Sequence, residues 1–302
     1  MTHGIGSEKT FLADEALLPS RLKDLWSEVL AGRLTEEEYA TRFEEWIAVY
    51  AKIWADALLL PGENDLKHSL CLELGKLEGC DDLAAIEQRC RMAMLKMKEE
   101  WNEGFREDDK EFTIRYYDQS TNYAYELMWW HTLVEDRSPL AYVAALHLAL
   151  QNGCKQSLDF GAGVGSGGLL FFRHGLTVAL ADISSTLLDF CRRRLAARSV
   201  PASFIDLKTD ELPIGKYDFI TAMDVFEHIA EPEKVIDSLA GALLPGGILF
   251  GRFNVDFNED RPSHIAHGFG ATFNRLAELG FEECWRDDWL WGHQAFRKVS
   301  RS

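Results

Sequence analysis

The chain has 302 residues, of which 47% are apolar and 27% are charged, a balance typical of globular proteins. Its formal net charge of −17 disfavours binding to nucleic-acid phosphates and to anionic membranes. The first residues lack a basic segment followed by an apolar one, and the most apolar early run is too short to span a bilayer. We therefore expect a protein of roughly two domains, with no nucleic-acid or membrane partner.

The cysteines indicate the compartment. There are six of them, scattered along the chain without a C-x-x-C pair. That distribution argues against a disulfide framework and against a zinc knuckle, and it fits reduced thiols in a cytoplasm. The sequence says nothing about oligomeric state.

Residues 15–153 read as consecutive helices, with no strand pattern and no repeat. A first helix is expected to begin at Ser20 as N-cap, and a second at Thr35, with Glu38 completing a capping box. A third begins with the segment "DDLAAIEQRC", and a fourth begins with Ser138 as N-cap and Pro139 in the first turn. We predict a helical N-terminal region over residues 1–150.

Residues 151–302 are predicted to form a second domain. Short β-rich runs such as "SLDF", "VALAD" and "YDFITAM" alternate with helical patterns. Continuous apolar strands separated by helices indicate a mostly parallel α/β sheet covered on both faces. The last two runs, "FEECWRD" and "WGHQAFRKV", have no helix between them and should form an antiparallel hairpin.

A glycine-rich turn, "LDFGAGVGSGG", follows the first expected strand. It matches the G-x-G-x-x-G of nicotinamide-binding folds through Gly163, Gly165 and Gly168, but a glycine-dense turn meets that pattern easily. The better registration is D-x-G-x-G-x-G, in which Asp159 ends the strand. An acid there suits a cationic ligand such as S-adenosylmethionine and would repel a pyrophosphate. Asp182, which ends the second strand, is placed to hydrogen-bond a ribose diol.

With these motifs, the sequence resembles the class I S-adenosylmethionine-dependent methyltransferases, in particular the small-molecule branch that includes ubiquinone-type O-methyltransferases. Four segments carry the resemblance in order: "LDFGAGVG", "LADIS", "YDFITAMDVFEHI" and "LLPGGILF". The family implies a Rossmann-like seven-stranded sheet of order 3-2-1-4-5-7-6 with an antiparallel last strand. It also implies S-adenosylmethionine as cofactor and a small-molecule acceptor.

The resemblance also implies cofactor contacts. Asp182 would hold the ribose hydroxyls, with Ile183 against the adenine. The adenine amino group would meet an acid after the third strand, either Asp206–Leu207, which we favour, or Asp210. The remaining expected contacts lie in the glycine turn, after the fourth strand and in the aromatic segment before the fold: Asp159, Gly161, Ala162, Gly163, Gly165, Met223 and Tyr117.

The segment "MDVFEHI" follows the fourth strand, where the acceptor would bind. On a helix, Asp224, Glu227 and His228 would share one face. In some relatives an E-x-x-E-H at this position binds Mg²⁺, but here the first acid is the shorter Asp224 and no fourth ligand is evident. We favour a substrate or base role for Glu227 and His228, with His264 and His267 as further catalytic candidates. Metal binding by residues 224–228, to which His264 or His267 could add a ligand, is one alternative, and plain packing or helix capping is the other.

Residues 115–131, "RYYDQSTNYAYELMWWH", are dense in aromatic side chains. They would form either a helical core that packs the N-terminal region onto the methyltransferase fold or a lid over the cofactor. Two other functions remain as alternatives to methyl transfer: a nicotinamide-dependent oxidoreductase and a non-catalytic S-adenosylmethionine-binding protein. Asp159 and the absence of a Y-x-x-x-K pair after the fourth strand disfavour the first of these.

Overall fold

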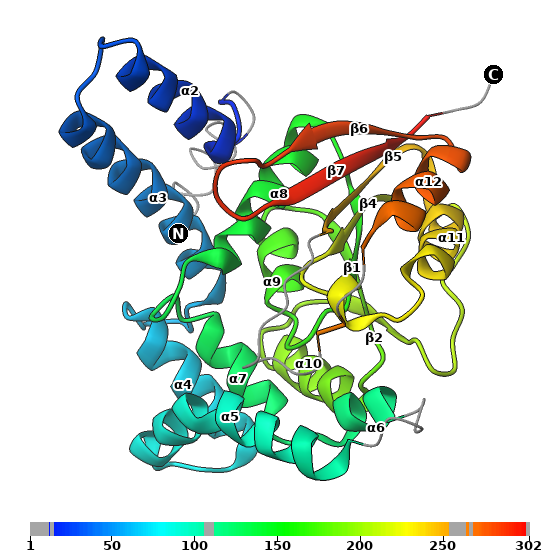
Figure 1. The fold of residues 1–302 in the computed structure, drawn as a ribbon. Helices are drawn as coiled ribbons and strands as arrows, with labels where there is room; N and C mark the ends of the chain where they lie inside the picture. Colours follow the sequence, from blue (N-terminus) through cyan, green and yellow to red (C-terminus); the bar gives the residue numbers. More distant parts are fainter. Residues whose placement is uncertain (1–11, 13–14, 106–111, 254–263, 266–267, 300–302) are drawn as a thin grey trace.

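The structure is a computed structural model and describes residues 12, 15–105, 112–253, 264–265 and 268–299. A seven-stranded sheet of order β3-β2-β1-β4-β5-β7-β6 forms its centre (Figure 1). The strands are β1 (Gln156–Phe160), β2 (Thr177–Asp182), β3 (Ala202–Asp206), β4 (Tyr217–Ala222), β5 (Leu243–Arg252), β6 (Phe281–Arg286) and β7 (His293–Lys298). All pairs are parallel except those that β7 makes with β5 and β6. The predicted strand order and the C-terminal hairpin are confirmed.

Both faces of this sheet are covered, as its continuous apolar strands predict. Successive side chains of a strand point to opposite faces, so Phe219 and Ile220 of β4 lie in two different apolar clusters. One cluster includes α9 (Ser166–Arg173) and α10 (Ser185–Ala197), and the other includes α11 (Pro232–Ala242) and α12 (Gly270–Glu278). The carboxyl ends of the parallel strands are thus left as the edge where a ligand can approach.

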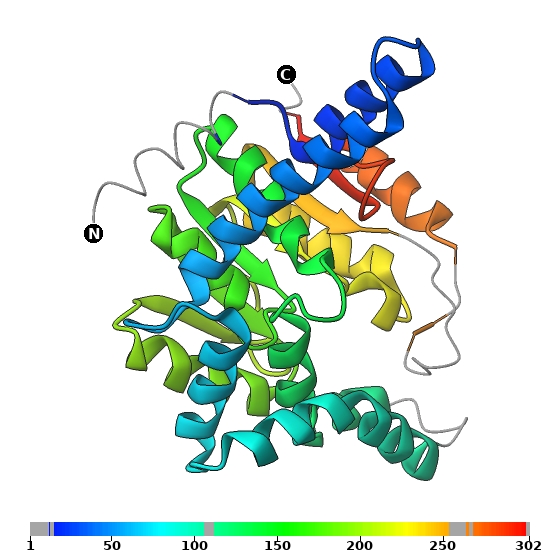
Figure 2. The same ribbon diagram turned by 90° about the vertical axis from the view of Figure 1, so that its left-hand side faces the viewer.

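The N-terminal half is helical, as expected. Its elements are α2 (Leu18–Leu30), α3 (Glu36–Leu58), α4 (Leu66–Glu78), α5 (Leu83–Gly104), α6 (Phe112–Gln119), α7 (Tyr123–Trp130), the 3-10 turn η1 (Ser138–Leu140) and α8 (Ala141–Gln151). Figures 1 and 2 show α2 to α5 gathered on the side of the sheet away from α11 and α12. One apolar cluster runs from Trp54 of α3 through Leu146 of α8 to Leu180 of β2, so the helical half and the sheet share a core.

Some helices begin at the capping residue that the sequence predicts, whereas others begin earlier because of packing. Thr35 and Glu38 form the predicted capping box. The prediction for Ser20 is wrong, because α2 already begins at Leu18, which is buried, with Pro19 in its first turn. The Ser20 hydroxyl instead lies 3.3 Å from Trp285 Nε1. Ser138 is likewise not an N-cap but the first residue of η1.

A buried ion cluster joins the two halves. Glu73 of α4 accepts hydrogen bonds from Arg194 and Arg198, at the end of α10, and the side chains of Glu73 and Arg194 are 4% and 0% exposed. Burial raises the pKa of Glu73, but the two guanidinium charges outweigh it and hold that pKa below its ordinary value. Arg194 also donates to the Val164 carbonyl at 2.8 Å, which fixes the back of the glycine turn.

Loss of one partner from a buried ion pair leaves an uncompensated charge, so we expect Arg194→Met to lower the free energy of unfolding by about 3 kcal/mol. Chemical denaturation measures this. The matched control is Arg33→Met, whose ion pair with Glu28 is exposed, and it should cause no measurable change. Equal effects of the two substitutions would contradict the prediction.

Candidate functional site

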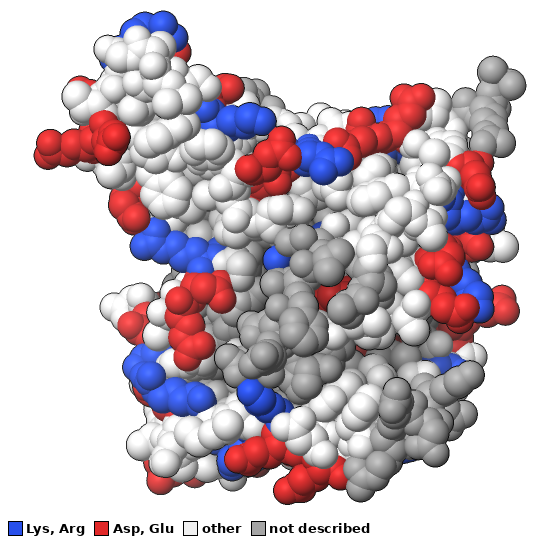
Figure 3. Space-filling view, viewed as in Figure 1, with Lys and Arg blue, Asp and Glu red and all other residues white. Residues whose placement is uncertain are grey.

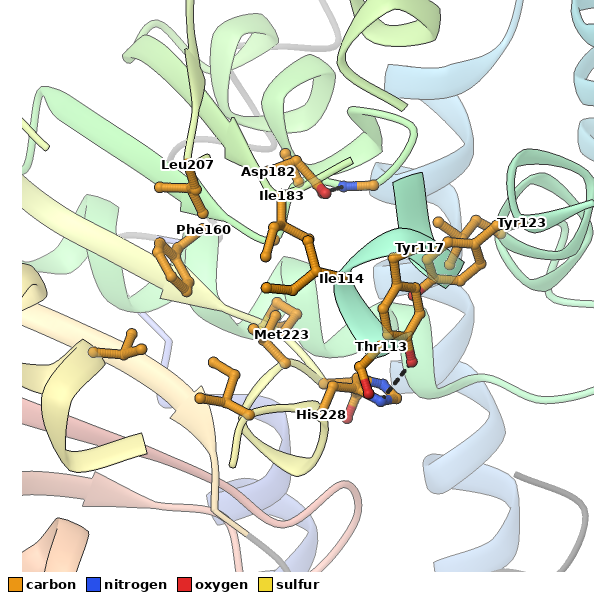
Figure 4. A pocket seen from close by; sticks show the side chains of 18 of the residues that line it. Thr113, Ile114, Tyr117, Tyr123, Phe160, Asp182, Ile183, Leu207, Met223 and His228 are labelled. Carbon is orange, nitrogen blue, oxygen red and sulfur yellow. Dashed lines mark hydrogen bonds between the residues drawn. The ribbon is translucent and has the colours of Figure 1, made fainter. Parts of the chain in front are cut away.

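A cavity of about 910 Å³ opens at the carboxyl ends of β1, β2 and β4. Its walls come from the loops after those strands and from α5, α6 and α7 of the helical half. Figure 4 shows Asp182 and Ile183 on one wall, Tyr117 and Tyr123 on the wall facing them, and His228 below. The volume lies in the range typical of small-molecule sites.

The glycine turn forms part of this wall. Gly161 and Gly163 line the cavity with φ values of 76° and 54°. The backbone N–H groups of Gly161 and Ala162 both donate to the Ala181 carbonyl, at 2.8 and 3.1 Å, which fastens the turn to β2. A Cβ atom at Gly163 would lie 2.8 Å from Leu127 Cδ1. Gly165, by contrast, faces Cys191 and Leu195 of α10 and is not among the lining residues.

Asp182 lies at the wall as the sequence predicts. Its two carboxylate oxygens accept hydrogen bonds from the Gly163 N–H and the Ser184 N–H, both at 2.8 Å. Burial raises the pKa of Asp182 to about 6, although the backbone donors oppose that shift. Ile183 follows it and also lines the cavity.

After β3, Leu207 and Asp210 line the cavity, whereas Asp206 is not among the lining residues. The Asp206 carboxylate instead accepts from the Ser185 hydroxyl at 2.7 Å. Of the two acids considered for this position, Asp210 is thus the one at the wall.

Asp159 lies beneath the turn rather than at the cavity wall. Its Oδ1 accepts from the Thr221 hydroxyl at 2.7 Å, and its Oδ2 has no hydrogen-bond partner among the described residues. Burial raises the pKa of Asp159 to about 7. A Cβ atom at Gly167 would be 2.6 Å from Oδ2, so the carboxylate sits against the first turn of α9.

The segment after β4 is a turn and not a helix. Asp224 has a φ of 48° and is followed by the 3-10 turn η2 (Phe226–His228), so Asp224, Glu227 and His228 do not share a helical face. Asp224 pairs with Arg252 at 3.0 Å. Among the described residues, the groups that could jointly hold a cation are Glu227, His228 and His264, whose ligand atoms lie within 4.8 Å of one another.

His228 has a defined orientation at the wall. Its Nδ1 lies 2.8 Å from the Tyr117 hydroxyl, a bond drawn in Figure 4, and its ring contacts that of His264 with centroids 4.7 Å apart. His228, His264, Met223 and Tyr117 all line the cavity. Glu227 is buried behind them, and His267 lies outside the described residues.

The aromatic segment serves two purposes. Tyr125 and Trp129 pack into the helical half, under the guanidinium groups of Arg89 and Arg91. Tyr117, Tyr123 and His131 line the cavity. Sequence reasoning missed the wall contributed by α5, where Met94, Met97 and Trp101 lie on one side of the helix at spacings of three and four residues.

The surface is mixed in charge. Figure 3 shows acidic and basic side chains interspersed on the face that it draws. No helix in the described part of the chain has both the length and the apolar character required to cross a membrane.

Comparisons with known proteins agree with this geometry. Residues 158–249 match a family model described as "Methyltransferase domain". The chain is 31% identical over 103 residues to ubiquinone biosynthesis O-methyltransferase of Coxiella burnetii. This alignment covers 32% of this chain and 42% of that protein. It is also 32% identical over 109 residues to demethylmenaquinone methyltransferase of Thermus thermophilus, in an alignment that covers 35% of this chain and 50% of that protein. The matches thus span half or less of these relatives' length.

Among solved structures, magnesium protoporphyrin IX methyltransferase of Synechocystis PCC 6803 with bound SAH aligns with a TM-score of 0.43 and 18% identity, over 53% of this chain and 82% of that one. The strand order, the glycine turn with Asp182 and the family match define a class I S-adenosylmethionine-dependent methyltransferase domain. The chain carries such a domain behind an N-terminal set of helices.

The pKa of Asp159 gives a prediction about stability. A carboxyl group whose pKa rises from 3.8 to about 7 on folding binds more protons in the native state, so its contribution lowers stability as pH rises from about 4 to about 7. Asp159→Asn removes this charge and keeps an oxygen that can accept from Thr221. We expect the variant to be more stable than the wild type by about 2 to 4 kcal/mol at pH 8 and nearly equal to it at pH 4.

Thermal unfolding of the ligand-free protein at both pH values checks this. If the stability of the variant still falls as the pH rises from 4 to 6, we attribute that dependence to Asp182, whose pKa is raised to about 6. A variant that is less stable than the wild type at both pH values would contradict the prediction.

Proposed function

We propose that the protein transfers a methyl group from S-adenosylmethionine to a small-molecule acceptor, by O- or N-methylation. One observation carries the proposal: a single cavity is lined at one end by Gly161, Gly163 and Asp182 and at the other by His228. S-adenosylmethionine would supply an electrophilic methyl group on a sulfonium and would leave as S-adenosylhomocysteine. The protein's tasks are then to align the acceptor, to exclude water and to remove a proton.

The residues present fit this cofactor. The Asp182 carboxylate at the wall suits a ribose diol, and the apolar side chains of Ile183 and Leu207 suit the faces of an adenine ring. Gly161 and Gly163 bring backbone to the cavity surface where larger side chains would collide with Val225 and Leu127. Asp210 is available to the adenine amino group. Asp159 lies below the turn, so it would affect cofactor binding indirectly, by helping to position the turn.

His228 is the proposed base. If its Nδ1–H donates to the Tyr117 oxygen, the lone pair of Nε2 can accept a proton from an acceptor hydroxyl or amine. Tyr117 is then a positioning residue, because it fixes the ring and the tautomer. Glu227 and His264 adjoin this imidazole and would shape its surroundings.

The acceptor is proposed to be an apolar, aromatic or hydroxylated metabolite. Met94, Met97 and Trp101 of α5, together with Ile114 of α6, give the acceptor end an apolar wall. Residues 1–150 would thus act as the substrate chamber and residues 151–302 as the methyltransferase domain. The printed names of the two relatives refer to ubiquinone and menaquinone chemistry, which agrees with such an acceptor.

The cytoplasm is the proposed compartment. All six cysteines are free thiols, as expected in a reducing environment.

Calorimetric titration tests the choice of cofactor. S-adenosylhomocysteine should bind, and NAD should not, because the buried carboxylate of Asp159 beneath the glycine turn opposes a pyrophosphate. Binding of NAD alone would favour the oxidoreductase. Binding of S-adenosylhomocysteine without methyl transfer to any hydroxylated aromatic acceptor would favour a non-catalytic binding protein.

Substitution of His228 tests the base. His228→Gln should lower kcat by roughly 100-fold to 10,000-fold and change the Kd of S-adenosylhomocysteine by less than about threefold. Tyr117→Phe keeps the ring and removes the hydroxyl, so kcat should fall only about fivefold. His68→Gln, at an exposed histidine of α4, serves as control. Equal losses of cofactor binding and of kcat in His228→Gln would overturn the assignment.

Metal-assisted deprotonation is a second candidate, favoured by the grouping of Glu227, His228 and His264. A carboxylate and two imidazoles would suit a transition metal better than Mg²⁺, and would lower the pKa of an acceptor hydroxyl. We favour the metal-free base, because the described residues bring only these three groups together and Asp224 is paired with Arg252.

Chelation separates the two candidates. We expect EDTA to leave both S-adenosylhomocysteine binding and turnover unchanged. Turnover that disappears with EDTA and returns with Mn²⁺ or Mg²⁺ in the wild type, but not in Glu227→Gln, would assign the metal instead.

A further inference from the structure

His131 is a buried histidine at the cofactor end of the cavity that the proposed reaction does not use. It follows the last turn of α7, is 4% exposed and belongs to the cavity lining. Its Nε2 has no hydrogen-bond partner among the described residues. A buried polar atom without a partner is costly, so such an atom beside a cavity points to a group that arrives with a ligand.

The hydrogen bonds behind His131 determine which of its nitrogens carries the proton. The guanidinium of Arg194 donates to the Ser166 hydroxyl oxygen at 2.9 Å, and that oxygen lies 2.9 Å from His131 Nδ1. Arg194 can only donate, so the serine oxygen accepts from it and directs its own proton to Nδ1. The tautomer assigned from this network has Nδ1 as acceptor and an N–H at Nε2.

This N–H lies in electropositive surroundings. Arg194 is fully buried behind Ser166, and together with Arg198 it shares the single carboxylate of Glu73, so this cluster carries a net positive charge. Ser166 is also the first residue of α9, where the helix dipole is positive. Burial, and then the charge of Arg194, lower the pKa of His131 to about 3, so the imidazole is neutral at physiological pH. A neutral donor beside a fixed positive charge favours an anionic acceptor over a cation.

We propose that His131 Nε2–H donates a hydrogen bond to the carboxylate of the methionine part of the cofactor. This inference rests on the proposed function. Gly163 and Leu127 line the same end of the cavity, whereas His228 lines the acceptor end. The carboxylate is the one anionic group of S-adenosylmethionine, and its amino and sulfonium groups are unsuited to a site backed by Arg194.

Two ligands that differ only in this carboxylate test the proposal by calorimetry: S-adenosylhomocysteine and its decarboxylated analogue. His131→Ala should weaken S-adenosylhomocysteine binding by about 10-fold to 100-fold and change binding of the decarboxylated analogue by less than about threefold. His131→Gln, which offers an amide N–H, should restore part of the loss. His174→Gln alters a buried histidine at the other end of α9 that does not line the cavity, and it should affect neither ligand.

Equal losses for both ligands, or no loss for either, would overturn the proposal. A wild-type protein that binds neither ligand would overturn the proposed function, and this inference with it. If His131→Ala does not fold, ¹⁵N-histidine NMR of the wild type still decides the question. It should show an Nε2–H tautomer whose resonance shifts with S-adenosylhomocysteine and not with the decarboxylated analogue, and an Nδ1–H tautomer would contradict the proposal.

Discussion

The buried cluster of Glu73, Arg194 and Arg198 is the interaction on which the rest of the structure depends. Arg194 receives its counter-charge from Glu73 of α4 through Nε and donates through Nη1 to the Val164 carbonyl and the Ser166 hydroxyl, so one guanidinium connects the helical half, the glycine turn and the start of α9. A charge with no exposed surface requires every one of these partners in place. The geometry of the cofactor end is thus tied to the packing of a helix that never lines the cavity.

The cavity has two ends of different character. At the cofactor end, the carboxyl groups of Asp159 and Asp182 are buried with raised pKa values, and each costs stability when it ionises. At the acceptor end, two imidazoles and Tyr117 meet an apolar wall from α5 and α6. Buried carboxyl groups near the proposed cofactor and an imidazole beside an apolar acceptor wall form a consistent arrangement for the proposed methyl transfer. The protein's own stability is lowered where the ligand is expected to bind.

The sheet could be predicted because its signals are local and strong. Continuous apolar runs such as "VALAD" mark strands buried on both faces. The strand order is implied by the resemblance to class I methyltransferases, and the predicted hairpin agrees with it. Helix α4 escaped prediction because its buried side includes Ser69 and Glu73 and therefore shows no clean apolar stripe. Glu73 is buried because it pairs with Arg194, which lies 121 residues away in the chain, so the sequence near Glu73 does not indicate its role. Sequence spacing also placed Asp224 beside Glu227, whereas the positive φ of Asp224 turns the chain differently.

The separation of the two cavity walls along the chain bears on how this protein could diverge from its relatives. The family match covers residues 158–249, which supply the glycine turn, Asp182 and His228, whereas the apolar acceptor wall is drawn from α5 and α6, upstream of it. Changes in those helices can reshape the chamber while the cofactor machinery stays intact. Sequence similarity within the matched segment therefore bears on the methyl donor and not on the acceptor. On the proposed function, the helices upstream of the matched segment select the acceptor, so a new substrate could be acquired there without leaving a trace in the matched segment.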